Sequence, residues 1–412
     1  MQILYDSCCG LDVHAKTVVA CLIKQGKKEI RTFSTMTSDL LKLLDWLIEQ
    51  GCTHAAIEST GVYWKPVFNV LEGTLEVILV NAYHVKAVPG RKTDVRDCEW
   101  LADLLRHGLL KASFIPPIEI RVLRELTRYR QSVVKEQAIV ANQIQKIAES
   151  GNIKLGQVAS DPLGVSGRAM LRALAQGETD AAKLATLARR RLKQKQAELQ
   201  LSLEGRLNEA QRWILNEMLD RYEQLEAAIE RVNRQIARKL ETAAHPFLKQ
   251  AVELIQEIPG IGERVAQTII SEIGIEMDRF PSPAHLASWA GMCPGNHESA
   301  GRRQRGQTTK GSIYLRVALV QAAWAATHTK ETYLAAQYQK LIKRLGRKKA
   351  LVAVGHSILL IVYQMLKNRV NYCDLGADYF DRLSVERQRR NLIRRLEALG
   401  CRVSIELKDA PV

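Results

Sequence analysis

The stretch ILYDSCCGLDVHAKTVVACLIKQGKKEIRTFS, residues 3–34, decides the fold class. Its apolar runs at 3–9, 17–23 and 29–34 predict three β-strands in succession, with a turn at Gln25-Gly26. The pattern after them alternates and predicts further elements at 40–50 (helix), 54–59 (strand), 63–71 (helix), 75–81 (strand) and 94–107 (helix). Three strands followed by alternating helices and strands is the order of a ribonuclease-H-like α/β fold with a mixed sheet.

Four carboxylates fall at the ends of these predicted elements. Asp12 lies in GLDVHAKT, Glu58 in AIESTGVYW, and Asp94 and Asp97 in KTDVRDCEWLADLL. Residues three apart share one face of a helix, so Asp94 and Asp97 are expected to point the same way. Carboxylate oxygens suit Mg²⁺ or Mn²⁺, and two such ions would stabilise the attacking and leaving oxygens of phosphoryl transfer.

Each of these acids also has an ordinary structural interpretation. Acids at strand ends and helix starts are common caps, and Asp94 could cap its helix with Asp97 in the first turn. His14 and His84 lie near the acids in sequence. We assign neither histidine to a metal, because lone histidines usually serve packing or hydrogen bonding.

A second informative stretch is WAGMCPGNHESAGRRQRGQTTKGSIYLR, residues 289–316. It places Ser299 in a loop with Gly, Asn and Pro and follows it with Arg302, Arg303, Arg305 and Lys310. A serine needs activation to act as a nucleophile, and fixed cations would hold a phosphodiester and stabilise the charge of its displacement. The alternative is a basic loop that only grips a nucleic-acid backbone; Ser288 and Ser312 are the other hydroxyls to consider.

The segment IQEIPGIGERVAQTIISEIG, residues 255–274, predicts a helix, a tight turn and a second helix. A helix-hairpin-helix of this kind offers backbone N–H groups, here around Gly260 and Gly262, to a phosphate without reading sequence. The apolar helix predicted at 314–326 would hold the basic loop against a core.

The middle of the chain is predicted to be helical. Residues 118–150 form one long helix, and frequent glycines at 151–177 indicate a break. A second long helix has apolar residues near heptad spacing, namely Met218, Tyr222, Leu225, Ile229, Val232, Ile236 and Leu240. The two helices are expected to form an antiparallel hairpin or coiled coil, and the basic run 188–195 is either solvated or laid along nucleic acid.

Charge and cysteine usage bound the partners and the compartment. The net charge of +16 and a pI near 9.5 favour a polyanionic partner. The apolar segment 350–366 contains Gly355, His356 and Ser357, so we expect a buried helix and no membrane span. The eight cysteines form no C-x-x-C pair, and the N-terminus lacks signal-peptide features, so a reducing cytoplasm is expected.

Several motifs together carry a resemblance to a known family. GxDVHxKT, ExTGxYW, KTDxxDxxxLA, PGxxxSAG with its basic run, and KGxxxLR resemble the IS110 family of insertion-sequence transposases, in its IS1111 branch. The resemblance implies a RuvC-like DEDD domain at 1–117, a helical coiled coil at 118–245, a mainly α transposase domain with a helix-hairpin-helix at 246–375, and a basic tail at 376–412.

The resemblance also implies an activity, a cofactor and partners. The activity is cutting and rejoining of DNA through a 5′-phosphoserine at Ser299, assisted by Mg²⁺ or Mn²⁺ on Asp12, Glu58, Asp94 and Asp97. The partners are donor and target DNA, a bridge RNA that guides the reaction, and further copies of the chain in a dimer and a synaptic tetramer. Nucleic-acid contacts are expected from Lys92, Gly260, Gly262, Arg302, Arg303, Arg305, Lys310 and Arg316.

Two other classes remain open from the residues alone. One is a metal-dependent, structure-specific nuclease of the junction-resolvase type, in which the carboxylates do the hydrolysis and Ser299 only binds. The other is a nucleic-acid-binding protein without enzymatic activity, in which the carboxylates are structural.

Overall fold

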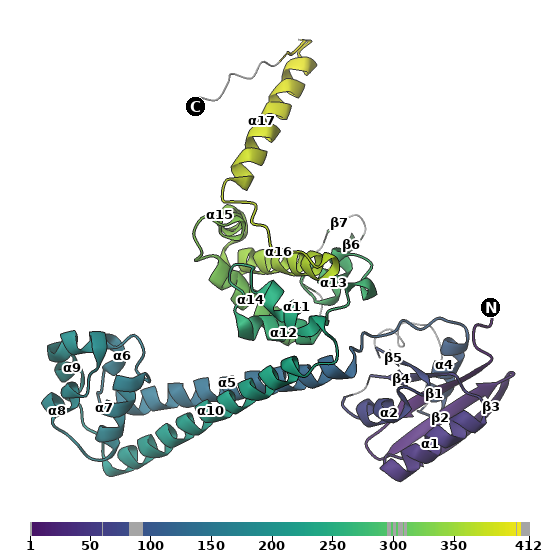
Figure 1. The fold of residues 1–412 in the computed structure, drawn as a ribbon, viewed down its shortest axis with the longest axis horizontal. Helices are drawn as coiled ribbons and strands as arrows, with labels where there is room; N and C mark the ends of the chain where they lie inside the picture. The colour runs from purple at the N-terminus through teal and green to yellow at the C-terminus, as the bar shows by residue number, and fades with distance from the viewer. Residues whose placement is uncertain are drawn as a thin grey trace. The chain divides into compact units, whose positions relative to one another are not determined.

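The computed structural model describes residues 2–59, 61–81, 94–294, 298–299, 302–303, 308, 311–400 and 402–404. Residues 94–96, 298–299, 302–303, 381, 383–388 and 391 are described by their backbone alone. The chain divides into two compact units, an N-terminal unit of residues 1–116 and a C-terminal unit of residues 117–412. Figure 1 shows the α/β character of the first and the helical character of the second.

The N-terminal unit is built on a mixed five-stranded sheet with the order β3-β2-β1-β4-β5. Its strands are β1 (Ser7–Val13), β2 (Thr17–Lys24), β3 (Lys27–Ser34), β4 (His54–Glu58) and β5 (Glu76–Val80). β2 runs antiparallel to β1 and β3, whereas β4 runs parallel to β1 and β5. This topology is compatible with the predicted ribonuclease-H-like fold.

Helices cover both faces of this sheet. Leu11 and Ile57 pack with residues of α1 (Thr37–Glu49) and α2 (Trp64–Leu71) in one hydrophobic core. Cys8 and Ala56 pack in a second core with residues of α4 (Asp94–Arg106). Because neighbouring residues of a strand point to opposite faces, the even-numbered positions of β1 and β4 face α4.

The first predicted strand was misplaced. The strand expected at 3–9 is observed at Ser7–Val13, and the side chains of Ile3 and Leu4 are 46% and 60% exposed. The backbone N–H of Leu4 donates to the carbonyl of Arg106 at the end of α4, not to a neighbouring strand. The remaining predicted elements of this unit occur, with ends shifted by at most three residues.

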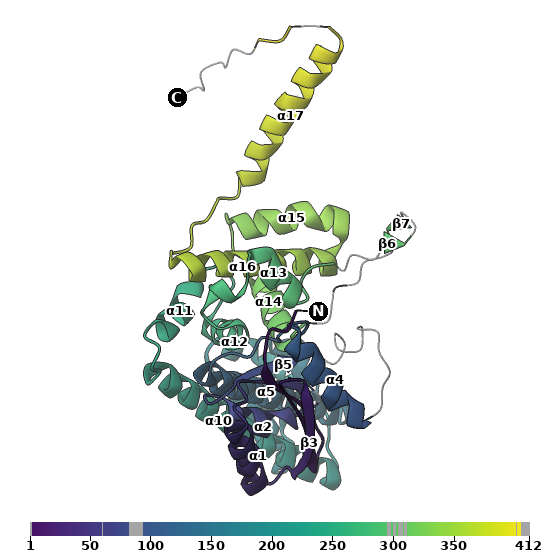
Figure 2. The same ribbon diagram turned by 90° about the vertical axis from the view of Figure 1, so that its right-hand side faces the viewer.

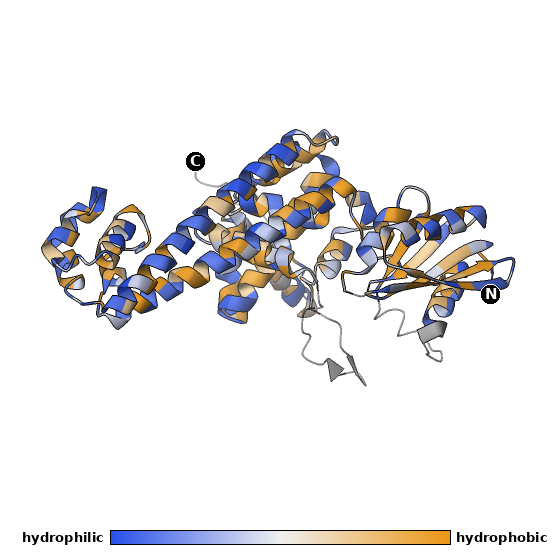
Figure 3. Cartoon of the chain, turned by 90° about the horizontal axis from the view of Figure 1, so that it is seen from below, coloured by the Kyte–Doolittle hydropathy of each residue, from blue (hydrophilic) through white to orange (hydrophobic). Residues whose placement is uncertain are grey.

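Two long helices, α5 (Ile118–Ser150) and α10 (Glu209–Glu241), dominate the first part of the C-terminal unit. Gln211 Nε2 donates to Ser150 Oγ at 2.9 Å, and Arg130 Nη1 donates to Asn233 Oδ1 at 3.2 Å. These pairs show that the two helices run antiparallel, as predicted. Apolar and polar residues alternate along both in Figure 3, as expected for helices with one packed face.

The break predicted from the glycines at 151–177 does end the first long helix at Ser150, but it contains short helices that were not predicted. Between the long helices lie α6 (Leu155–Val158), α7 (Val165–Ala175), α8 (Ala181–Thr186), the 3₁₀ helix η1 (Arg190–Lys195) and α9 (Gln196–Ser202). We call residues 155–202 the helical head. Its own core includes Met170, Leu184 and Leu199 together with Leu215 and Leu219 of α10. Gly167 belongs to this packing, since a Cβ there would lie 2.0 Å from the Pro162 carbonyl oxygen.

The described remainder of the C-terminal unit is mainly helical and includes a short hairpin. It contains α11 (Phe247–Ile255), α12 (Glu263–Ile273), η2 (Met277–Arg279), α13 (Pro283–Trp289), β6 (Glu298–Ser299), β7 (Arg302–Arg303), α14 (Ile313–Ala326), α15 (Tyr333–Leu345), α16 (Arg347–Asn368) and α17 (Tyr379–Ala398). Figure 2 shows α14 and α16 among the other helices of this part.

α16 is the helix that the apolar segment 350–366 predicted. By length and composition it could cross a membrane, and among the described helices it alone meets that test. It packs against α11, α13, α14 and α15, and Val354, Ile358 and Val362 are fully buried. The prediction of a buried core helix is therefore confirmed.

Candidate functional site

Asp12 and Glu58 end two adjacent parallel strands at the same level. Leu11 of β1 is in register with Ile57 of β4, so Asp12 and Glu58 are the next residues along each strand. Both occupy even-numbered positions and therefore belong to the sheet face that α4 covers. The sheet thus brings these two predicted site residues together.

α4 runs antiparallel to β1 and lies very close to it. Leu4 N bonds to Arg106 O at 2.8 Å, and Cys8 Sγ to Ala102 O at 3.6 Å. A Cβ on Gly10 would lie 2.2 Å from the carbonyl oxygen of Cys98, so only glycine permits this approach. Because the contacts move toward the N-terminus of α4 as β1 proceeds, the first turn of α4 lies at the strand end that carries Asp12.

That first turn begins with Asp94 and contains Asp97, which is half-buried. The backbone of Asp94 is helical from the start of α4, while its side chain lies outside the described part of the structure. Lys92 and His84 also lie outside the described residues. The fold therefore gathers Asp12, Glu58 and the α4 start at one end of the sheet.

The environment of Asp12 is polar and partly open. Its side chain is 19% exposed, and its Oδ2 lies 3.1 Å from Nε2 of the exposed His14. The pKa of Cys98 on α4, one residue after Asp97, is lowered by its hydrogen bond with Cys21, against the opposing effects of burial and of the Asp12 charge. Among the side chains that the structure describes, no three His, Cys, Asp or Glu residues form a metal-holding group. Asp12, Glu58 and Asp97 are carboxylates of the type predicted to bind a metal ion, and the side chain of the fourth predicted ligand, Asp94, lies outside the described part of the structure.

Ser299 lies on a two-stranded hairpin in the C-terminal unit. β6 and β7 are antiparallel, with Ser299 opposite Arg302 and Glu298 opposite Arg303. Residues directly opposite in such a pair are near neighbours. Arg305 and Lys310 lie outside the described residues.

The chain on either side of this hairpin is tightly fixed. A Cβ on Gly311 would lie 2.1 Å from the carbonyl oxygen of Ala290, so the two ends of the segment touch. Pro294 and Thr308 form an antiparallel β-bridge. Arg316, predicted to bind nucleic acid, is half-buried and donates through Nη2 to the Gly291 carbonyl at 3.2 Å. We call 290–294 and 311–316 the hairpin base.

The two other candidate hydroxyls differ in their surroundings. Ser312 is the N-cap of α14 and accepts a hydrogen bond from the Leu315 N–H. Its Oγ also donates to Glu272 Oε2 at 2.9 Å, so both roles of the hydroxyl are used. Ser288 lies on the exposed side of α13.

Gly260 and Gly262 lie between α11 and α12, where a helix-hairpin-helix was predicted. Gly260 has φ +89°, and a Cβ there would lie 2.3 Å from the Ala322 carbonyl oxygen of α14. The close contact with α14 therefore explains why residue 260 is a glycine. Gly262 is the N-cap of α12, and a Cβ there would meet nothing within 4 Å. The open side of the turn is thus at Gly262.

A buried polar cluster beneath the hairpin base was not predicted from the sequence. Glu272 of α12 is 1% exposed, and both its oxygens accept hydrogen bonds from Arg128 of α5, at 2.7 and 2.8 Å. Burial acts to lower the pKa of Arg128, but its hydrogen bonds to Glu272 raise it overall. Burial lowers the pKa of the neighbouring Arg124 to about 10. A helix pattern with arginines on an apolar face was the only signal for this cluster.

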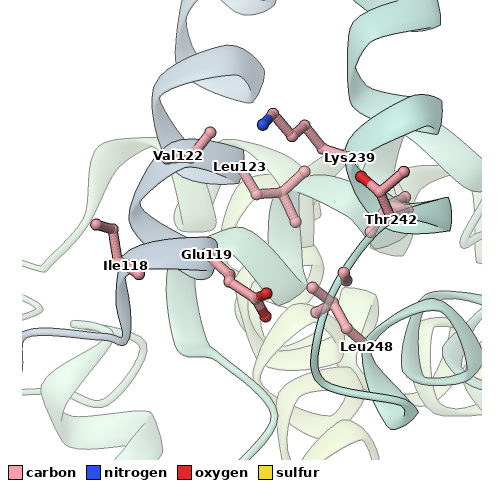
Figure 4. Close-up of a pocket in the computed structure, with 9 residues that line it drawn as sticks. Ile118, Glu119, Val122, Leu123, Lys239, Thr242 and Leu248 are labelled. Carbon is pink, nitrogen blue, oxygen red and sulfur yellow. The ribbon is translucent and has the colours of Figure 1, made fainter.

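A small pocket of about 140 Å³ lies between the start of α5 and the end of α10 (Figure 4). Most of its lining is apolar, including Val122, Leu123 and Leu248. Its one carboxylate, Glu119, accepts hydrogen bonds from the backbone N–H groups of Ala244 and His245. These contacts fix the connection after α10, so the pocket is structural.

Comparisons with known proteins point to one family. The DEDD transposase model of the IS110 type, described as "Transposase", matches residues 9–151, and a model described as "Transposase IS116/IS110/IS902 family" matches residues 252–339. A "Probable family 20 transposase" of Pseudomonas aeruginosa is 22% identical over 370 residues, 88% of this chain and 94% of its own length. A "Pilin gene-inverting protein" of Moraxella bovis is 23% identical, over 87% of this chain and 95% of its own length. A protein of the same name from Moraxella lacunata matches equally well.

Proposed function

The chain belongs to the IS110 family of transposases, and from that premise we propose that it cuts and rejoins DNA through a covalent linkage to Ser299. The observation that carries the proposal is the register of the hairpin, which sets Ser299 opposite Arg302. A guanidinium beside a hydroxyl would hold a phosphate against the nucleophile and neutralise the charge of displacement. The name of the Moraxella relatives, gene-inverting proteins, agrees with a reaction that breaks and reseals DNA.

In the proposed reaction Ser299 Oγ attacks the phosphorus of a backbone phosphate. The new Oγ–P bond replaces the bond from phosphorus to the 3′ oxygen, and the serine proton leaves as the 3′ oxygen gains one. The product is a 5′-phosphoserine and a free 3′-hydroxyl. A 3′-hydroxyl of another strand then attacks the same phosphorus, which restores the serine and joins the strands. The number of phosphodiester-type bonds is unchanged, so the reaction needs no energy source.

A DEDD-type transposase domain implies the use of a divalent metal ion, and we propose Mg²⁺, with Mn²⁺ as a substitute. Asp12, Glu58, Asp94 and Asp97 would hold it. Two parallel strands with their acids at one level, and a helix start at the same end, support this assignment. When bound, such an ion stabilises negative charge on phosphate oxygens. The four acids would repel one another without it, so their approach is expected to depend on the ion.

The family implies DNA substrates, and the remaining partners are part of the proposal. We propose a bridge RNA that pairs with donor and target DNA, and a dimer that assembles into a synaptic tetramer in the bacterial cytoplasm. Lys92, Gly262, Arg302, Arg303, Arg305, Lys310 and Arg316 are proposed to contact nucleic acid, with Gly260 shaping the turn beside Gly262. The net charge of +16 supports a polyanionic partner.

The proposal is tested on a denaturing gel after incubation of the chain with labelled DNA, its guide RNA and Mg²⁺. A protein–DNA band is expected for the wild type and for Ser288→Ala, and its loss is expected for Ser299→Ala. DNA cleavage without a covalent band, abolished by Asp12→Asn, would instead assign a metal-dependent nuclease. DNA binding without a covalent band and without cleavage would indicate a nucleic-acid-binding protein that is not an enzyme.

A further inference from the structure

The buried carboxylate of Glu272 joins three helices at the base of the serine hairpin. It receives two hydrogen bonds from Arg128 of α5 and one from Ser312 at the start of α14, while it stands on α12 itself. The side chain is 1% exposed. A buried charge requires such partners, because burial without them is strongly unfavourable.

Arg128 makes a second contact that strengthens the connection to α14. Its guanidinium carbon lies 4.6 Å from the centre of the Tyr314 ring, in the first turn of α14. Lys135 Nζ, one further α5 cation, lies 5.9 Å from the same ring. α5 therefore holds the start of α14 both through Glu272 and directly.

The neighbouring Arg124 secures the other side of the cluster. It donates to the backbone carbonyls of Ser271 and Glu272, at 2.9 and 2.8 Å, in the last turn of α12. Carbonyls in the last turn of a helix lack partners within the helix. In addition, Ser271 Oγ lies 2.8 Å from Thr127 Oγ1 of α5. The backbone that carries Glu272 is thus fixed as well as its side chain.

Ser312 connects this cluster to the hairpin. Its hydroxyl caps α14, and the residue before it, Gly311, packs against the carbonyl of Ala290 at the opposite end of the segment. The negative charge of Glu272 also lies at the positive end of the α14 dipole. Any displacement of Ser312 would move Gly311 and with it the end of the segment that contains Ser299 and Arg302.

We infer that Glu272 is a positioning residue for the serine reaction: with Arg128 and Ser312 it fixes the hairpin base and so sets where Ser299 meets the phosphate. The inference rests on the proposed function of Ser299. Glu272 does not touch substrate in this role. Its loss should slow formation of the covalent linkage while leaving DNA binding unchanged, because misplacement of a reacting group lowers rate more than affinity.

The first test compares rates of linkage formation in single-turnover reactions at saturating DNA. Glu272→Gln and Ser312→Ala are expected to slow the reaction at least about tenfold, with the Kd for DNA within about twofold of wild type. Ser312→Thr keeps the hydroxyl and is expected to react at close to the wild-type rate. Glu226→Gln, which breaks the ion pair of Glu226 with Arg168 in the head, is the matched control.

A purely structural role must be separated from positioning. Leu319→Ala removes a fully buried side chain of α14 without touching Glu272 and lowers thermal stability. At a temperature well below every melting point, it should form the linkage faster than Glu272→Gln. Equal slowing in both, at equal loss of Tm, would overturn the inference, and so would wild-type rates for Glu272→Gln and Ser312→Ala.

Hydrogen exchange keeps this inference distinct from the proposal for Ser299. If the covalent band survives in Ser299→Ala, the nucleophile assignment fails. The backbone amides of 311–316 should still exchange faster in Glu272→Gln than in wild type, with Glu226→Gln unchanged. Unchanged exchange at these amides would refute the positioning role whatever the nucleophile is.

Discussion

Ser299 lies directly opposite Arg302 in the antiparallel pairing of β6 and β7. The neighbouring pair joins Glu298 to Arg303. The backbone register therefore pairs the serine with one arginine and the glutamate with the other. The hairpin thereby gives two adjacent arginines different expected roles.

Arg302→Ala should therefore slow formation of the covalent linkage by about 10²-fold, the usual cost of losing one group that stabilises transition-state charge. Arg303→Ala should slow formation of the covalent linkage less than Arg302→Ala does, because Arg303 is paired with Glu298. Both rates are measured in single-turnover reactions at saturating DNA. A larger loss for Arg303→Ala than for Arg302→Ala would contradict the roles assigned by the register.

Gly260 and Gly262 should respond differently to alanine. Gly260→Ala places a Cβ at φ +89° and 2.3 Å from the Ala322 carbonyl oxygen, so it should lower the free energy of unfolding by at least about 2 kcal/mol. The Cβ of Gly262→Ala would lie in open space, so this variant should lower the free energy of unfolding by less than about 1 kcal/mol. Denaturant titration measures both.

If the turn at Gly262 contacts phosphate, Gly262→Ala should weaken DNA binding despite its small effect on stability. The Kd is measured at two salt concentrations, since a phosphate contact is sensitive to salt. Wild-type affinity at both concentrations would show that this turn does not contact DNA.

Metal binding should stabilise the wild-type chain and not Asp12→Asn. An ion that binds only the folded chain adds about 2.7 kcal/mol at a concentration 100 times its Kd. The Tm is therefore expected to rise with Mg²⁺ or Mn²⁺ for the wild type and to fall back when a chelator is added. His14→Gln leaves the carboxylate of Asp12 in place and serves as the control. An equal Tm rise in Asp12→Asn would argue against the acids as ligands.

His356 on α16 should make stability depend on pH. Burial lowers its pKa below the ordinary value near 6.5. The unfolded chain therefore takes up a proton first as pH falls, and the folded state loses stability below about pH 6.5, at up to about 1.4 kcal/mol per pH unit. His356→Gln should lose less stability between about pH 7 and about pH 5.5. Identical losses in denaturant titrations of both proteins would contradict the assignment.

Much of the N-terminal fold could be predicted because its strands are short and bounded by turns. The exception was the first strand. Ile3 and Leu4 are apolar yet exposed, whereas Gly10 and Asp12 interrupt the true strand with residues that usually disfavour one. Gly10 is required by the closeness of α4, a contact between residues about 90 positions apart that no local pattern reveals.

The helical head was missed for a related reason. Frequent glycines were interpreted as a break, but Gly167 lies inside α7 because Pro162 leaves no room for a side chain. Local propensity disfavours glycine in a helix, and tertiary packing overrode it here. The prediction of an antiparallel pair succeeded because the apolar spacing of α10 is regular over several turns.

The residue types of the candidate site could be predicted from the sequence, but the residues that hold them in place could not. Ser299 and Arg302 are close in sequence, so their association could be predicted. Glu272 could not be connected to Arg128 by the same means, since 144 positions separate them and the hydrogen bonds depend on how α5 packs on α12. Buried polar clusters of this kind depend on tertiary structure alone.

The antiparallel pair of α5 and α10 has a mechanical consequence. α5 has 33 residues, so at a rise of 1.5 Å per residue it is about 50 Å long. The first half of α5 packs against α12, at Arg124 and Arg130, and its other end carries the head. The pair is thus a rigid spacer of fixed length. Removing seven residues from each helix would shorten it by about 10 Å. Any ligand that contacts both ends of the pair must match its length.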